Sequence, residues 1–425
     1  MAKLIRYCAL TLGGLIASGA IGLFVTTRDE APPDVSDLAP RPLTLPPEEN
    51  AHLILRKLAA EFVALPKDEA YDAALKRLTG ENGWSIADAS LVVRSADSLW
   101  PRFDAATGQA QSDVALLSQL GKSRSYISDL NKLWEVIEIR IKLTTQTIGP
   151  DEGLALALIA HKRALHVTNA GGDYVDMVVG VGVYASAQHE LLEILTKAAP
   201  SSDAMRRYIG MLEEIRIPAA ACADSLKTGY AHMPEEIEDM RRAHGTEDDF
   251  FGDDLPWGAQ WLYKPNQTKR MAADLTRNLI GAIDQPYWVI KQVSQPIASP
   301  VLFSKVPTPD NAYGKFFMEM VPGALGSTLK VRLKVQTRVS VAQAWMGATL
   351  YERENGRLPD SLDQLVPEYF PVVPRDYFTG ETVCYSAAAR AVWSAGENEL
   401  VLTSSNEEIP NHAIAMKLSP QISAR

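Results

Sequence analysis

The sequence predicts a mainly α-helical protein attached to a membrane, and three observations support that fold class. An uncharged apolar run occupies residues 7–25, and a proline-rich stretch follows it. Apolar residues then recur at helical spacing through most of the next part of the chain. We therefore expect a transmembrane signal-anchor helix over residues 1–28 and a linker over 29–50. A body of helical hairpins over 51–310 and a small α+β module over 325–425 complete the expected order.

The composition is that of a folded protein with no affinity for nucleic acid. Of 425 residues, 46% are apolar and 22% are charged, which is ordinary for a globular chain. The net charge of -10 gives no positive footprint that would attract nucleic acid. We therefore do not expect a nucleic-acid partner.

The apolar run at residues 7–25 has the length of a membrane-spanning helix. At about 1.5 Å per residue it would cover roughly 28 Å, close to one hydrocarbon core. Lys3 and Arg6 precede it, and a basic flank keeps the N-terminus in the cytoplasm. A cleaved signal peptide ending near residues 17–20 is the alternative, but the apolar run continues past that point. We expect a single-pass cell-membrane protein whose body is periplasmic or extracellular.

The linker at residues 29–50 is expected to be a semi-extended spacer between the membrane and the body. Proline-rich segments favour extended backbone and have no internal hydrogen bonds. Its six prolines are Pro32, Pro33, Pro40, Pro42, Pro46 and Pro47.

The helical body shows a clear apolar face over residues 126–148. The apolar side chains recur at helical spacing, and they are Ile127, Leu130, Leu133, Trp134, Ile137 and Ile141. The break at residues 169–173 and Pro200 separate further helical stretches, as in antiparallel hairpins with short loops.

Residues 232–267 form the most unusual stretch, expected to be a long irregular loop rich in acids and aromatics. A functional interpretation gives four carboxylates to a divalent cation, and these are Asp248, Asp249, Asp253 and Asp254. In the same interpretation Trp257 and Trp261 anchor a protein partner. The alternative is a solvated acidic loop whose tryptophans plug the helical core. No other cofactor is expected.

A long helix is expected over residues 325–355, ended by Gly356 and Pro359. Short strands should follow over 382–386, 391–394, 399–403 and 413–418.

This C-terminal stretch resembles the soluble half of type II secretion pseudopilins, in which a long helix packs on a small antiparallel sheet. Similar segments also end large uncharacterised bacterial envelope proteins. The matching positions are Tyr351, Gly356, Pro359, Leu362, Leu365, Val366, Pro367, Tyr369, Pro374, Asp376, Gly380, Tyr385, Ser394 and Gly396. The chain departs from the family at its start, because the apolar run contains no glutamate and no prepilin leader. The resemblance implies a pseudopilin-like local fold and a place in secretion or envelope assembly.

The leading functional hypothesis is a non-enzymatic envelope protein that contacts other envelope proteins. Its N-terminal helix is expected to anchor it in the membrane. No complete catalytic motif occurs, since the SxxK and KTG matches stand in reversed order. One alternative is an extracytoplasmic hydrolase or metal-dependent enzyme, for which His161, His166 and His189 are candidate ligands. Another is a helical peptide- or glycan-binding module. Cys222 and Cys384 are either free thiols or a disulfide.

Overall fold

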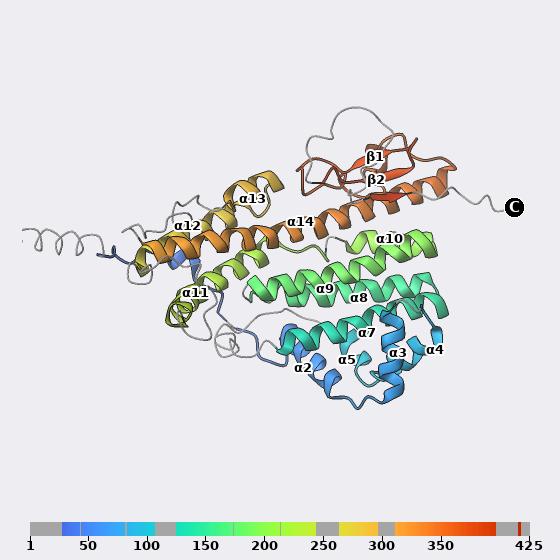
Figure 1. Ribbon diagram of the computed structural model, residues 1–425. Coiled ribbons are helices and arrows are strands. Elements are labelled where there is room, and N and C mark those ends of the chain that lie inside the picture. Colours follow the sequence, from blue (N-terminus) through green and yellow to red (C-terminus); the bar gives the residue numbers. More distant parts are fainter. Residues whose placement is uncertain are drawn as a thin grey trace, which may run out of the picture. The chain divides into compact units, whose positions relative to one another are not determined.

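A computed structural model describes residues 28–42, 44–80, 83–106, 125–172, 174–212, 214–243, 263–295, 311–396 and 415–417. The described chain is mainly helical with one small sheet, as the sequence predicts (Figure 1). It divides into two compact units assembled from separated stretches. Unit 1 comprises Met1–Ala39, Gly229–Leu279 and Gln292–Gly326, and unit 2 comprises Pro40–Thr228, Ile280–Lys291 and Ser327–Arg425. This division differs from the expected boundary between residues 310 and 325.

The N-terminal part of unit 2 is an all-helical body. Its helices are α2 (Ala51–Ala64), α3 (Glu69–Thr79), α4 (Ile86–Arg94), α5 (Trp100–Ala105), α7 (Ser125–Thr147), α8 (Pro150–Thr168), α9 (Tyr174–Glu193) and α10 (Ser202–Met211). A π-helical turn, Ile194–Ala198, extends α9, and α11 (Ala219–Ala243) begins in this unit. The predicted helical hairpins are thus present in α7, α8 and α9, which pack side by side (Figure 1).

Short polar residues start several of these helices. The side chains of Asn50, Asp68, Ser85 and Ser201 each accept a hydrogen bond from a backbone N–H in the first turn. These caps satisfy donors that the helix itself leaves unpaired. They explain why the sequence enters a helix at each of these four points.

The C-terminal half of α14 (Ala312–Asn355) also belongs to unit 2, and its buried face carries polar side chains. Arg332 Nη1 donates to the carbonyl oxygen of Ile283 at 2.8 Å, and Gln336 Nε2 donates to that of Ile217 at 2.8 Å. Ile283 directly follows the end of α12, and Ile217 stands two residues before the start of α11. Because buried carbonyl oxygens need a hydrogen-bond donor, the buried polar side chains of α14 supply one to each of them.

After a 3-10 turn (Leu362–Leu365) come the strands β1 (Cys384–Ser386), β2 (Ala391–Trp393) and β3 (Ala415–Lys417). They form an antiparallel sheet in the order β1-β2-β3, and the expected strand over 399–403 lies outside the described residues. Asp376, only 1% exposed, organises the approach to this sheet. Its carboxylate accepts hydrogen bonds from Ser394 Oγ at 2.8 Å and from the backbone N–H of Phe378 at 2.9 Å.

Unit 1 contains a 3-10 turn (Ser36–Leu38), the second part of α11, most of α12 (Pro265–Ala282) and the beginning of α14. Asn311, fully buried, joins the starts of α12 and α14. Its Oδ1 accepts a hydrogen bond from the backbone N–H of Lys264 at 2.8 Å, and its Nδ2 donates to Thr268 Oγ1 at 2.9 Å. The short helix α13 (Tyr287–Val293) lies mostly in unit 2.

Three sequence expectations need correction. The irregular loop expected from residue 232 begins later, because α11 continues through Pro234 to Ala243 with Met233 and Ile237 buried. Burial of this face outweighs the proline. Helix α14 begins before residue 325 because Phe316 and Phe317 bury an additional stretch. The linker is not extended throughout, since Leu38 is buried at its 3-10 turn.

The expected transmembrane helix lies outside the described residues. Among the helices that are described, none has the length and hydrophobicity needed to cross a membrane.

Candidate functional site

A candidate site among the described residues is an open groove of about 780 Å³ between α7 and α9. We call it the acidic groove, and its lining residues are Ile127, Ser128, Asn131, Lys132, Trp134, Glu135, Glu138, Gly182, Val183 and Ser186. On both helices these residues fall on one face, at the three- and four-residue spacing that aligns side chains along a helix. Because α7, α8 and α9 follow one another through short turns, α7 and α9 run in the same direction. The groove therefore follows two neighbouring parallel helices.

The opposite face of α7 holds the groove in place. Helix α7 packs on α2, α4 and α8, and the predicted apolar residues Leu130, Leu133 and Ile137 are buried there. Trp134 is also buried, with its ring edge-on to Phe103 at 6.1 Å between ring centroids. The apolar pattern that predicts the helix also fixes which of its residues line the groove.

Two glycines of α9 have opposite roles beside the groove. A Cβ atom at Gly180 would come within 2.7 Å of the backbone nitrogen of Thr168, so this glycine allows α8 and α9 to pack closely. A Cβ atom at Gly182 would meet nothing within 4 Å. The absence of a side chain at Gly182 is therefore unnecessary for packing and leaves the groove open.

The groove carries three carboxyl groups whose pKa values are raised. Burial raises the pKa of Glu138 to about 7, and the negative charges of Glu190 and Glu135 add to this effect. Burial likewise raises the pKa of Glu190 to about 7, with Glu193 acting in the same direction and Lys142 and Lys197 opposing it. Burial also raises the pKa of Glu135.

Glu190 belongs with the groove although it stands one turn beyond its lining residues. It follows Ser186 by four residues on α9, so it lies on the same helix face. Glu138 and Glu190 form no hydrogen bond or ion pair with any other described residue. Both groups change charge near neutral pH.

The indole of Trp134 is the largest aromatic group that lines the groove. Its Nε1–H is buried and has no acceptor among the described residues. Most buried donors in folded proteins have a hydrogen-bond acceptor, so this indole is an exception among the buried groups of α7. The groove thus combines polar side chains that can donate hydrogen bonds (Ser128, Asn131, Lys132 and Ser186), the carboxyl groups of Glu135 and Glu138, and the apolar side chains of Ile127 and Val183.

The candidate histidine site predicted from the sequence does not form. His161 is fully buried, with its Nδ1 at 2.7 Å from the carbonyl oxygen of Ala157 and its ring edge-on to Tyr184. His189 is exposed on α9. Burial lowers the pKa of His161 to about 4 and that of His166 to about 4. Within the described ranges no three His, Cys, Asp or Glu residues are placed to hold a metal ion.

The other predicted site residues lie outside the described part of the chain. These are Asp248, Asp249, Asp253, Asp254, Trp257 and Trp261. Cys222 is buried and Cys384 half-buried, and both are free thiols. The disulfide alternative is therefore wrong.

The sequence contains only part of the signal for the acidic groove. Glu135 and Glu138 stand three residues apart beside the apolar face of residues 126–148, which marks two acids at the border of a buried surface. Glu190 raises the pKa of Glu138 only because α9 packs on α7. No spacing rule along the chain connects residues so far apart.

Compared with protein-family models, curated proteins and solved structures, the chain shows no match in any of the three.

Proposed function

We propose that the chain is a non-enzymatic, membrane-anchored protein of the cell envelope that contacts another envelope protein through the acidic groove. The proposal rests on two half-buried carboxyl groups, those of Glu138 and Glu190, whose pKa values are raised to about 7. The buried indole N–H of Trp134, which has no acceptor among the described residues, belongs to the same lining. Ionised carboxylates held in a partly buried place destabilise the folded chain unless a cation compensates them. A partner that brings positive charge would supply this compensation.

The occupant that fits the groove is an amphipathic helix bearing lysine or arginine. Two helices side by side present a groove that the ridge of a third helix can enter. The lining contains two glutamates against one lysine, Lys132. Beside it stands Glu190, whose negative charge is partly offset by Lys142 and Lys197. An apolar strip on the partner would face Ile127, Trp134 and Val183, while its basic residues meet the carboxylates.

Location in the envelope is supported by the apolar run of residues 7–25 and its basic flank. The pseudopilin-like C-terminal stretch supports a role in secretion or envelope assembly by fold-level analogy alone. These two features suggest where the partner is found, and the groove suggests how the partner is held.

The test uses purified full-length chain and a fluorescent synthetic helix with leucines on one face and lysines beside them. We expect saturable binding that weakens at least fivefold in the Glu138→Gln/Glu190→Gln variant and strengthens between pH 6 and pH 8 as the carboxylates ionise. The same peptide with glutamate in place of lysine should not bind. Equal binding of both peptides, or no effect of the double variant, would contradict the proposal.

A steric control separates the groove from general surface charge. Gly182→Phe should fill the groove and abolish binding, whereas Gly210→Phe should leave it intact. Gly210 is an exposed glycine of α10 at which a Cβ atom also meets nothing within 4 Å. Both variants are thus expected to fold equally well.

A second function is favoured by one observation, the pKa of about 7 shared by Glu138 and Glu190. Carboxyl groups that titrate near neutrality are suited to general acid–base catalysis, so a hydrolase is the alternative. Hydrolysis of a panel of ester, peptide and glycoside substrates, lost in Glu138→Gln, would favour the hydrolase over the contact protein.

A further inference from the structure

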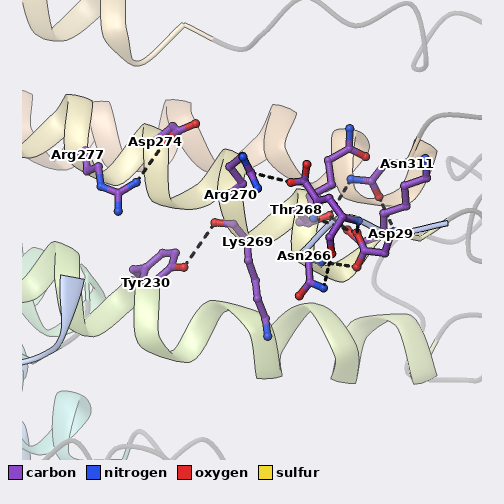
Figure 2. Close-up of polar contacts among 12 residues, drawn as sticks. Asp29, Tyr230, Asn266, Thr268, Lys269, Arg270, Asp274, Arg277 and Asn311 are labelled. Atoms are coloured by element: carbon purple, nitrogen blue, oxygen red, sulfur yellow. Dashed lines mark hydrogen bonds and ion pairs between the residues drawn. The ribbon is translucent and has the colours of Figure 1, made fainter. Parts of the chain in front are cut away.

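The residues that directly follow the apolar run are bound to α12. Figure 2 shows Asp29 at the beginning of α12, next to Asn266. The Asp29 carboxylate accepts hydrogen bonds from the backbone N–H groups of Asn266 at 2.7 Å and Gln267 at 3.2 Å. Asn266 Nδ2 donates in return to the carbonyl oxygen of Glu30 at 2.8 Å. Asp29 therefore acts as the cap of a helix that lies more than two hundred residues later in the chain.

Ion pairs continue this attachment along the same helix. The Glu30 carboxylate lies 2.8 Å from Arg270 Nε. The Arg277 guanidinium donates to both oxygens of Asp37, at 2.8 and 2.9 Å, and to the carbonyl oxygen of Asp34 at 2.8 Å. A planar guanidinium that meets a carboxylate through two parallel bonds is the most specific form of such a pair.

Together these contacts define a clasp, residues 29–38, that runs beside α12. The contacts follow the same order in both segments, from Asn266 through Arg270 to Arg277, and the buried side chain of Leu38 ends the clasp. Eleven residue steps separate Asn266 from Arg277, and along a helix they correspond to about 16 Å. The attachment is thus distributed over three turns of α12.

The place where the clasp begins is itself a junction of unit 1. Asn311 ties the start of α14 to Lys264 and Thr268, and Tyr230 Oη of α11 lies 3.5 Å from the carbonyl oxygen of Lys269 (Figure 2). The clasp is consequently attached to the packed interior of unit 1.

Chain length then limits the distance between unit 1 and the end of the apolar run. Four residue steps separate Val25 from Asp29. At no more than about 3.6 Å per residue they span about 14 Å. A free proline-rich segment over residues 29–50 would instead allow roughly 68 Å at about 3.1 Å per residue.

We infer that unit 1 lies at the membrane surface and that residues 29–38 clasp α12 to hold it there. This inference rests on the membrane anchoring included in the proposed function. Residues 29–38 of the proline-rich segment then do not act as a free spacer. The partner of unit 1 is accordingly the bilayer interface next to its own anchor.

The test measures energy transfer from a donor dye on α12 to acceptor-labelled lipid in nanodiscs holding the full-length chain. Asn278, exposed on α12, is replaced by cysteine and labelled, with Cys8 and Cys384 replaced by serine. We expect strong transfer, reduced at least twofold in Asp29→Ala/Asp37→Ala. Reversing one pair with Arg277→Glu should reduce the transfer, and adding Asp37→Arg should restore it.

Two results would overturn the inference, and they are distinguishable. If the chain stays in the nanodisc but transfer is weak, or unchanged in Asp29→Ala/Asp37→Ala, the clasp does not set the position of unit 1 and the anchoring stands. If the chain does not enter the nanodisc at all, the anchoring fails and the inference fails with it.

Discussion

Replacing Glu138 with glutamine should stabilise the folded chain at alkaline pH and have no effect at acid pH. The pKa of Glu138 is about 7 in the folded chain against an ordinary 4.5. This raised pKa means that the folded state binds a proton more tightly than the unfolded state does. The stability that the protonated carboxyl permits is therefore fully present below pH 4.5 and is lost as the pH rises through 7.

The magnitude follows from the difference between these two pKa values. At about 1.4 kcal/mol per tenfold change, the full difference would correspond to about 3.4 kcal/mol. Glu138 is partly exposed, and solvent screening reduces the expected gain to about 1–2 kcal/mol. Glutamine keeps the shape of the side chain but carries no charge at any pH, so the gain should be confined to pH above about 5.

Thermal unfolding of the full chain at pH 5 and pH 8 measures this effect. We expect the Tm of Glu138→Gln to exceed that of the wild type by about 1–3 °C at pH 8 and by less than about 1 °C at pH 5. Glu381→Gln, an exposed control, should change neither value. A lower Tm for Glu138→Gln at pH 8, or the same difference at both pH values, would refute the assignment of a raised pKa to burial in the groove.

Three further predictions concern the groove, the buried histidines and the C-terminal module. Gly182→Phe should abolish binding of the lysine-bearing helix in fluorescence anisotropy, whereas Gly210→Phe should bind as the wild type does. Burial lowers the pKa of His52 to about 3, so unfolding free energy should fall as pH drops from 6.5 towards 4, and less steeply in His52→Leu when followed by urea denaturation. Asp376→Ala should destabilise the module by about 2–4 kcal/mol and raise amide exchange over residues 374–396, unlike the exposed Asp363→Ala.

The sequence predicts the local elements well where one periodic pattern decides the structure. Leu130, Leu133 and Ile137 predict both the existence of α7 and the face that it buries. Gly356, in a left-handed conformation at the end of α14, stops that helix where the sequence expects it. At these positions the local signal and the tertiary packing agree, so a single sequence is enough.

Prediction fails where partners far apart in the chain decide the outcome. Pro234 is a local stop signal, yet α11 continues because Ile237 finds a buried place. The linker is rich in proline, yet its first ten residues form hydrogen bonds and ion pairs with the N-terminal turn and the arginines of α12. Such pairings cannot be inferred from periodicity, because nothing near Asp29 in the chain indicates Asn266.

The same reason limits prediction of the candidate site. Sequence composition directs attention to the acids and tryptophans of residues 244–262, where charge is most concentrated. Those residues lie outside the described part of the chain, so that prediction stays a prediction. The structure adds Glu138 and Glu190, which are unremarkable in sequence and acquire raised pKa values through burial in the fold. A high density of charge along the sequence does not predict a raised pKa, because the pKa of a carboxyl group rises when the group is buried in the folded chain.

Photo-cross-linking in native membranes tests the central claim most directly, with a photoreactive amino acid at Asn131 in the groove and, as a control, at the exposed Asn355. We predict one discrete adduct from position 131 whose cross-linked peptide is an amphipathic segment with lysine or arginine at helical spacing. The adduct should disappear with Gly182→Phe and persist with Gly210→Phe. An adduct that is indifferent to Gly182→Phe, or an equal yield from position 355, would contradict a contact made through the acidic groove.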